Sequence, residues 1–207
     1  AIHTIQPRLV IFSAQSLRTA STLLDAAEYL AELDIPVAFG GYIFVSSPEL
    51  VEYIPGYYLG EAMEAIPERI AQFMRDPDIE PVDKKPSQSY LSALEDFRSN
   101  RSTIESKLMA KLSQERFKSV SLSIINQDFG NDIDAALRLG NLQFMNDNLV
   151  WLRELMENKD YPKPNITLNI FLQAYYNAAA EVLSDKSDVF LQWLASKVEN
   201  EQLETQA

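Results

Sequence analysis

The chain has 207 residues, 46% of them hydrophobic, and its 30 acidic and 18 basic side chains give a net charge of −12. That length allows one large or two small domains, and the acidic excess leaves no basic face for the phosphate backbone of DNA or RNA. Cysteine is absent, which excludes disulfides, thiolate metal sites and thiol nucleophiles and fits a reducing cytoplasm. No apolar run approaches the length of a membrane span, and the first residues lack the features of a secretory signal. We therefore expect a cytoplasmic protein without membrane contacts.

The first third of the chain alternates between apolar runs and helical periodicity. Residues 9–12 and 35–39 are apolar throughout, which is typical of strands in a parallel sheet covered by helices. Apolar residues recur at helical spacing over 17–30, so a helix is predicted between the two strands. The unit is completed by a short helix, a short strand and a closing helix, predicted at 48–53, 57–59 and 63–74.

The remaining sequence predicts a linker and a helical bundle. Three prolines alternate with charged residues over 76–88, which indicates a linker. The segment 89–207 has the apolar periodicity of four or five antiparallel helices. Within it, an interruption is expected near Ser99-Asn100, with a new helix beginning at the capping box that starts at Ser102.

Two glycines and two tryptophans give further expectations for the bundle. Gly130 predicts the left-handed end of a helix, and Gly140 predicts a break in a long amphipathic segment. Trp151 and Trp193 lie at apolar helical positions, so we expect both in the core. The polar tail 199–207 is expected to fray.

A ligand is expected at the carboxyl ends of the two apolar strands. Ligands of open parallel sheets bind in the crevice at that edge, which here comprises residues 13–16 and 40–42. Gly40 and Gly41 at this edge have no side chains, so a ligand could approach the backbone closely there, beside the hydroxyl group of Ser13.

Three segments resemble the second half of a cobalamin-binding domain, in the same order and spacing. Residues 6–13 resemble the "xPDLVGLS" strand, residues 37–41 the "VPVxxGG" strand, and residues 54–65 the "GADxYxxDAxEA" ending. The resemblance covers about residues 1–74. It implies a partial flavodoxin-like (Rossmann-like) α/β domain at 1–75, a linker at 76–88 and an all-α bundle at 89–207.

In that family the corrin ring lies on the strand ends and its nucleotide tail runs into the sheet. The resemblance therefore implies cobalamin as the cofactor. The implied cofactor-binding residues are Ser13, Gln15, Ser16, Gly40, Gly41, Tyr42 and Tyr58.

The chain departs from the family at its amino-terminal side. The family's Asp-x-His-x-x-Gly loop, whose histidine ligates cobalt, has no counterpart, and the only histidine is His3, before the serine strand. Gln15 also stands where the family has leucine or threonine. We therefore expect no metal ligand in this chain, and a bound cobalt that is base-off or ligated from outside. We further expect that the chain is a fragment without the amino-terminal half of its domain. Alternatively, a partner chain or the helical bundle takes the place of that missing half.

The segment Gly40-Gly41-Tyr42-Ile43-Phe44 resembles the form found in MerR-type cobalamin-dependent transcription regulators. This implies a non-catalytic, ligand-sensing module that acts through a change of assembly, as a homodimer or with a partner regulator. DNA would be bound only through a region outside this chain. The alternatives are a corrinoid-carrying subunit of a methyltransferase or mutase, and a degenerate dimerisation scaffold that binds no ligand. Whether the bundle caps a ligand, mediates dimerisation or acts separately is left open by the sequence.

Overall fold

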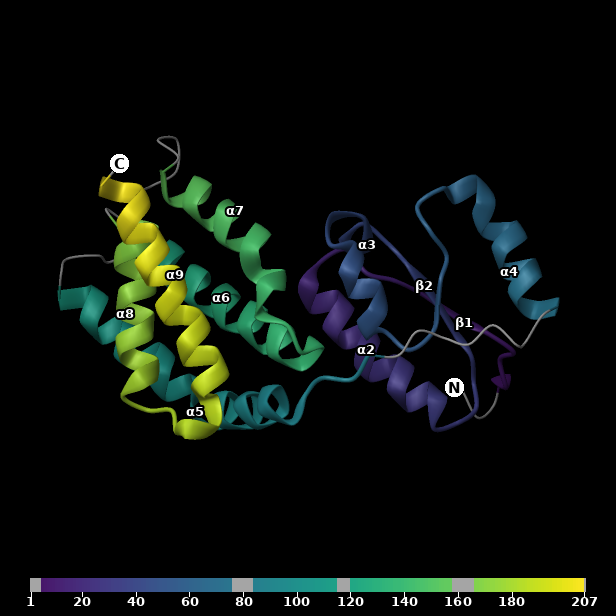
Figure 1. Cartoon of the computed structure of the whole chain (residues 1–207), viewed down its shortest axis with the longest axis horizontal. Coiled ribbons are helices and arrows are strands. Elements are labelled where there is room, and N and C mark those ends of the chain that lie inside the picture. The colour runs from purple at the N-terminus through teal and green to yellow at the C-terminus, as the bar shows by residue number, and fades with distance from the viewer. Residues whose placement is uncertain (1–4, 76–83, 115–119, 158–165, 207) are drawn as a thin grey trace. The chain divides into compact units, whose positions relative to one another are not determined.

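The structure is a computed structural model that describes residues 5–75, 84–114, 120–157 and 166–206. The chain divides into two compact units, residues 1–86 and 87–207, which are drawn in Figure 1 and considered separately below. Most of the predicted linker, 76–83, lies outside the described residues. None of the helices in the described part combines the length and apolar character that a bilayer crossing requires.

The first unit contains a parallel sheet of three strands. They are β1 (Val10–Ser13), β2 (Val37–Gly40) and β3 (Tyr57–Tyr58), in the order β1-β2-β3. β1 and β2 pair from Val10 opposite Val37 to Ser13 opposite Gly40, so both strands end at the same edge. The three strands predicted from sequence are confirmed, each shifted by one or two residues.

The helix α2 (Leu17–Ala31) connects β1 to β2 and confirms the predicted helix. It begins where Ser16 and Thr19 form a capping box, which satisfies backbone groups that the first turn leaves unpaired. Its buried apolar side chains recur at helical spacing, namely Leu17, Ala20, Leu23, Leu24, Ala27 and Leu30.

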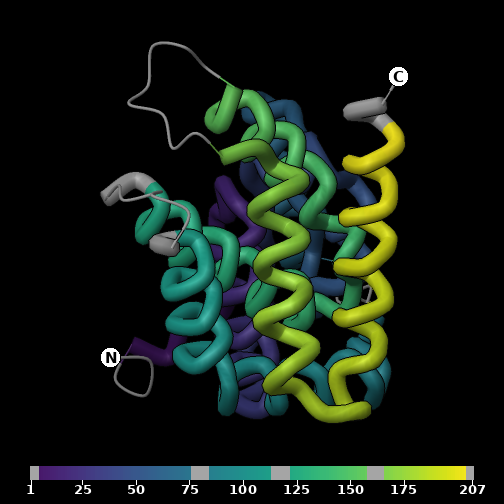
Figure 2. Tube along the Cα trace, turned by 90° about the vertical axis from the view of Figure 1, so that its left-hand side faces the viewer, coloured from purple at the N-terminus to yellow at the C-terminus, as the bar shows by residue number. Residues whose placement is uncertain are grey.

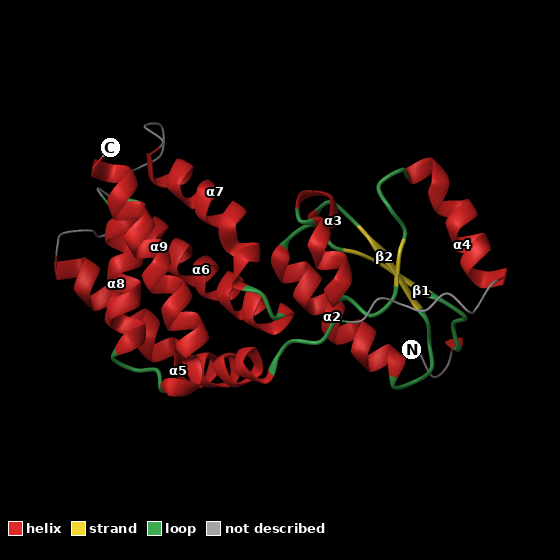
Figure 3. Ribbon diagram, in the orientation of Figure 1, coloured by secondary structure: helices red, strands yellow, loops and turns green. Residues whose placement is uncertain are grey.

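Shorter helices complete this unit. A single helical turn, α3 (Ile43–Ser46), follows β2 and was missed by the sequence analysis. The predicted helix at 48–53 is a 3-10 helix, η1 (Pro48–Tyr53), and the closing helix is α4 (Ile66–Arg75), preceded by the 3-10 turn η2 (Met63–Ala65). Figure 3 shows α2 and α3 on one side of the strands and α4 on the other.

The second unit is a helical bundle, as predicted. Its described helices are α5 (Gln88–Gln114), α6 (Val120–Leu139), α7 (Asn146–Glu157), α8 (Leu168–Ala180) and α9 (Asp188–Gln206). α5 packs against α6, α8 and α9, and α8 runs alongside α9 (Figure 2). The 3-10 turns η3 (Leu142–Met145) and η4 (Asp185–Ser187) precede α7 and α9. The core includes the aromatic side chains of Phe97, Phe129, Phe171, Tyr175 and Phe190.

The interruption predicted near Ser99-Asn100 is wrong, because α5 is continuous through it. Ser99 Oγ donates to the carbonyl of Glu95, and Asn100 Nδ2 donates to the carbonyl of Asp96. These side chains bond backward to the preceding turn, so they do not compete with the helical hydrogen bonds. Ser102 accordingly lies inside a helix and caps none.

The helix end predicted at Gly130 is also wrong, since α6 continues to Leu139. Gly130 is needed for packing: an added Cβ would lie 2.7 Å from Glu105 Oε1 and 2.9 Å from Arg101 Nε. The glycine therefore lets two side chains of α5 lie across the backbone of α6. The break at Gly140 is confirmed, because that residue has φ of +82° and ends α6.

The two tryptophans differ in burial. Trp193 is buried as predicted, whereas Trp151 is 56% exposed on α7, so its assignment to the core was wrong. The polar tail is helical, because α9 extends to Gln206, and its fraying stays a prediction. An ion pair between Glu201 and Arg153 of α7 anchors that part of the helix to the bundle.

Candidate functional site

The carboxyl edge of the three-stranded sheet, here called the sheet rim, comprises residues 13–16, 40–42 and 58–61. Ser13 pairs with Gly40, and the backbone N–H of Ala14 donates to the carbonyl of Gly40 at 2.9 Å. Tyr58 pairs with Phe39 on the next strand. The rim therefore contains all seven residues implied as ligand contacts, although their binding role stays a prediction.

Gln15 connects the first two strand ends through its side-chain amide. Its Nε2 donates to Ser13 Oγ at 2.8 Å, and its Oε1 accepts from the backbone N–H of Tyr42 at 3.4 Å. This residue, which departs from the family pattern, thus engages two other predicted contacts. A ligand that reaches Ser13 or the Tyr42 N–H has to replace Gln15 there or bind beside it.

The two rim glycines have different surroundings. Gly41 has φ of +119°, and an added Cβ would lie 2.1 Å from the carbonyl oxygen of Ala14, so the chain's own backbone occupies that space. At Gly40 an added Cβ would lie 3.9 Å from Gly60 O and 4.0 Å from Leu59 Cβ, which are ordinary contacts. Gly41 is therefore required by the packing of the chain itself, whereas an added Cβ would fit at Gly40 without displacing its neighbours.

Ser16 has a local structural role at the start of α2. Its hydroxyl oxygen accepts from the backbone N–H of Thr19, and Thr19 Oγ1 in turn accepts from the backbone N–H of Ser16 at 2.9 Å. Because N-terminal capping already accounts for a serine at this position, Ser16 contributes no independent support for a ligand.

Tyr58 carries a polar group that its surroundings leave unsatisfied. Its ring lies 5.8 Å from that of Phe39 and 5.9 Å from that of Phe44, measured between centroids. The hydroxyl is buried and has no hydrogen-bond partner among the described residues. Burial raises the pKa of Tyr58, the charge of Glu61 raises it further, and the charge of Arg69 opposes both. The hydroxyl is therefore a neutral donor.

The sequence analysis missed Arg69, a cation beside the rim. Gly60 has φ of +79°, and an added Cβ would lie 2.5 Å from Arg69 Nη1, so the guanidinium of α4 rests against the backbone that follows β3. A glycine directly after a short strand was the available signal, because it permits such a close approach. Apolar side chains are exposed nearby, with Tyr42 65% and Val45 42% accessible.

A second candidate site is the α5–α6 groove of the helical bundle, with a volume of about 730 Å³. Its lining is polar except for one methionine. It consists of Arg98, Arg101, Ser102, Glu105, Ser106 and Met109 from α5, and Ser123, Asn126, Gln127 and Asn131 from α6.

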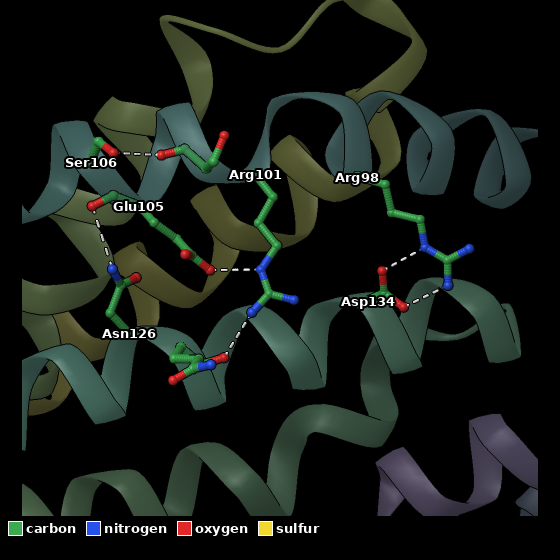
Figure 4. Close-up of polar contacts among 8 residues, drawn as sticks. Arg98, Arg101, Glu105, Ser106, Asn126 and Asp134 are labelled. Carbon is green, nitrogen blue, oxygen red and sulfur yellow. Dashed lines mark hydrogen bonds and ion pairs between the residues drawn. The ribbon is translucent and has the colours of Figure 1, made fainter.

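Two arginines of α5 bridge this groove to α6 (Figure 4). Arg98 makes a bidentate pair with Asp134, with N–O distances of 2.6 and 2.7 Å. Arg101 Nε contacts Glu105 Oε1 at 2.6 Å, and its Nη2 donates to the carbonyl of Gln127 at 2.9 Å. Bidentate pairs hold both side chains in one geometry, so these contacts fix the register of the two helices.

Asn126 is the buried polar residue of the groove, with 4% of its surface exposed. Its Nδ2 donates to the carbonyl of Glu105 at 3.4 Å, but its Oδ1 has no partner among the described residues. Behind the groove, burial raises the pKa of Tyr175, Glu105 raises it further, and Arg101 opposes the shift.

Within the described ranges, no group of three histidine, cysteine, aspartate or glutamate side chains is placed to hold a metal ion. His3 lies outside the described residues. No protein-family model matches the chain, and no curated protein matches it either.

Proposed function

We propose that the α/β unit is the ligand-sensing module of a regulator, and that it binds an elongated cofactor at the sheet rim. The observation that carries this proposal is the buried Tyr58 hydroxyl, which has no partner among the described residues. Leaving a buried donor unsatisfied costs about 1 to 3 kcal/mol, and a ligand acceptor removes that cost. Cobalamin is the first ligand to test, because of the resemblance of residues 1–74 to that family.

The order of the strands supports the finer description of the fold. A flavodoxin-like sheet has the strand order 2-1-3-4-5, in which the last three strands follow one another as neighbours. The parallel order β1-β2-β3 corresponds to those three strands. In this proposal the α/β unit is the second half of such a sheet, and its ligand occupies the edge where the strands end.

The residues of the rim fit part of a cobalamin molecule. Gly40 leaves room beside the backbone, Tyr58 offers a donor, and Arg69 supplies positive charge for an anionic tail. The space at Gly41 is filled by Ala14, so the ligand does not enter there. Bound cobalamin would supply a coloured cobalt centre; the residues described here bind and orient it.

Sensing would operate through Gln15. Its amide connects Ser13 to the backbone N–H that precedes α3. A ligand that takes over the contact with the Tyr42 N–H releases Gln15 from the residue that precedes α3, in a region where Tyr42 and Val45 are exposed. A ligand with different affinity for the two arrangements shifts their populations, and with them the surface available for assembly.

The test is to mix the full chain with hydroxocobalamin and with adenosylcobalamin, and to record the visible spectrum after desalting. We expect retained colour, and a change in sedimentation coefficient between the free and the loaded protein. Tyr58→Phe should retain less cofactor than the wild type. Absence of retained colour with both forms would rule out cobalamin as the ligand.

A second candidate function, a dimerisation scaffold without ligand, is favoured by the contact between Gly41 and Ala14. That contact explains the second glycine of the pair through packing alone. A scaffold would form the same dimer at every cobalamin concentration, whereas a sensor would not. Sedimentation across a cofactor titration separates the two.

A further inference from the structure

We propose that the α5–α6 groove binds a small zwitterion of the amino-acid type. Its ammonium group would donate to Asn126 Oδ1 and to Glu105, and its carboxylate would accept from Arg101. This site lies in the helical unit, and its existence does not depend on the function proposed for the sheet rim.

The acceptor side of the site is set by Asn126. Its amide orientation is determined by the contact of Nδ2 with the carbonyl of Glu105, because the reversed amide would bring two carbonyl oxygens together. The unpaired group is therefore an oxygen, and it requires an N–H or O–H donor. Nearly complete burial makes this requirement costly to leave unmet.

Glu105 adds a second acceptor with a negative charge. Its Oε1 is occupied by Arg101 Nε, whereas no described residue donates to Oε2. Its backbone carbonyl holds Asn126, so the carboxylate and the amide oxygen belong to neighbouring positions of one groove. Two adjacent acceptors, one of them charged, suit an ammonium group, which offers three donors.

The donor side of the site is set by Arg101. A guanidinium has five N–H donors, and two of its nitrogens are engaged with Glu105 and Gln127. Its Nη1 has no partner among the described residues. Its planar geometry matches a carboxylate, and Ser102 places a hydroxyl group in the same lining.

The balance of charge in the groove favours a ligand without net charge. Arg101 is paired with Glu105, and Arg98 is paired with Asp134 beside the groove. A purely anionic or cationic molecule would leave one of its ends beside a like charge. A zwitterion carries opposite charges at its two ends, so its ammonium group can contact Glu105 while its carboxylate contacts Arg101.

The test uses thermal unfolding of the full chain with each of the twenty free L-amino acids at millimolar concentration, followed by calorimetric titration of the strongest responder. We expect at least one amino acid to raise the melting temperature by several degrees. Its N-acetyl amide, which lacks both charges, should give no shift. Equal shifts with the N-acetyl amide, or no response to any of the amino acids, would each overturn the proposal.

Asn126→Leu distinguishes a ligand-binding role from a structural one. The substitution removes the unpaired oxygen and also the 3.4 Å contact of Nδ2 with the Glu105 carbonyl, at similar volume, so the melting temperature of the free protein should stay close to that of the wild type while affinity falls at least tenfold. A lower melting temperature with unchanged affinity would overturn the role given to Asn126. Asn148→Leu on α7 is the matched control, because Asn148 does not line the groove. Glu105→Gln, which keeps a hydrogen-bond acceptor for Arg101, should weaken binding without unfolding the bundle.

Discussion

The sheet rim and the α5–α6 groove differ in how their residues come together and in which polar atoms have no hydrogen-bond partner among the described residues. At the rim, several predicted contacts already satisfy one another: Ser16 caps a helix, Gln15 holds Ser13, and Gly41 accommodates Ala14. In the groove, residues up to 33 positions apart meet only because two helices pack, and Asn126 keeps a buried oxygen unpaired among the described residues. The sequence motif at the rim can thus be explained largely by helix capping and backbone packing. The groove matches no sequence motif, yet it contains a buried acceptor without a hydrogen-bond partner among the described residues.

The largest effect is expected at Gly41, where the local explanation can be tested directly. Gly41→Ala combines a strained φ of +119° with a Cβ 2.1 Å from a carbonyl oxygen, and should lower the free energy of unfolding by about 3 to 5 kcal/mol. Gly40→Ala should cost about 1 kcal/mol or less, because its Cβ meets ordinary contacts. Urea unfolding followed by circular dichroism measures both. Equal costs would show that the two glycines do not differ as described.

The next effect concerns Asp96, which fixes the position of α5. Its Oδ2 accepts from Ser184 N, Ser184 Oγ and Ser187 Oγ at 2.8 to 2.9 Å. Asp96→Ala should therefore cost about 2 to 3 kcal/mol in the free energy of unfolding. Ser99→Ala on the same helix is the control, and should change stability by about 0.5 kcal/mol or less. A similar loss in both variants would contradict the importance of this cluster.

Acid should remove the contribution of Asp96. Burial alone would raise the pKa of Asp96, but the hydrogen bonds from Ser184 and Ser187, helped by the charge of Lys186, lower it overall. A lowered folded-state pKa means that the stabilisation is present above the unfolded value of 3.8 and is lost as the pH falls through the folded value. The stability difference between wild type and Asp96→Asn should therefore shrink below about pH 4. A difference that is constant from pH 7 to pH 3 would argue against an ionised Asp96 in this role.

A smaller effect is expected at Gly130, under the groove. Alanine is favoured over glycine inside a helix by about 1 kcal/mol, but here the new methyl group meets Glu105 and Arg101 at less than 3 Å. Those atoms end flexible side chains, so we expect them to move and the net loss to be about 1 to 2 kcal/mol. The unfolding free energy of Gly130→Ala measures the loss of stability. The shift of its melting temperature with free amino acids measures whether movement of Arg101 and Glu105 affects binding. An unchanged response to amino acids would show that the Arg101–Glu105 pair is not part of the binding site.

The smallest change in stability is expected for Tyr58→Phe. It removes a buried hydroxyl without a described partner, so the free protein should be unchanged or more stable by about 1 kcal/mol. Tyr53→Phe in η1 serves as the control. A loss of more than about 1 kcal/mol at Tyr58 would mean that its hydroxyl is satisfied in the free protein, and the main support for a ligand at the rim would disappear.

Much of the α/β unit was predictable because its signals are local. The apolar run that ends at Ser13, the periodicity of α2 and the capping pair Ser16 and Thr19 all lie within a few turns of chain. The bundle was less predictable at points where polar residues occur inside helices. Gly130 and Ser99 have local preferences for helix ends, and long-range packing or backward hydrogen bonds overrode those preferences.

Sequence alone determined the helical and strand periodicities, the excess of negative charge and the edge of the sheet where polar residues gather, because each depends on spacing along the chain. Tertiary structure decided which atoms remain unsatisfied. The filling of Gly41 by Ala14, the approach of Arg69 to Gly60 and the unpaired oxygen of Asn126 all depend on atoms brought together across the fold. Hydrogen bonds and close contacts act over a few ångströms, and no pattern along the chain specifies distances on that scale between remote residues.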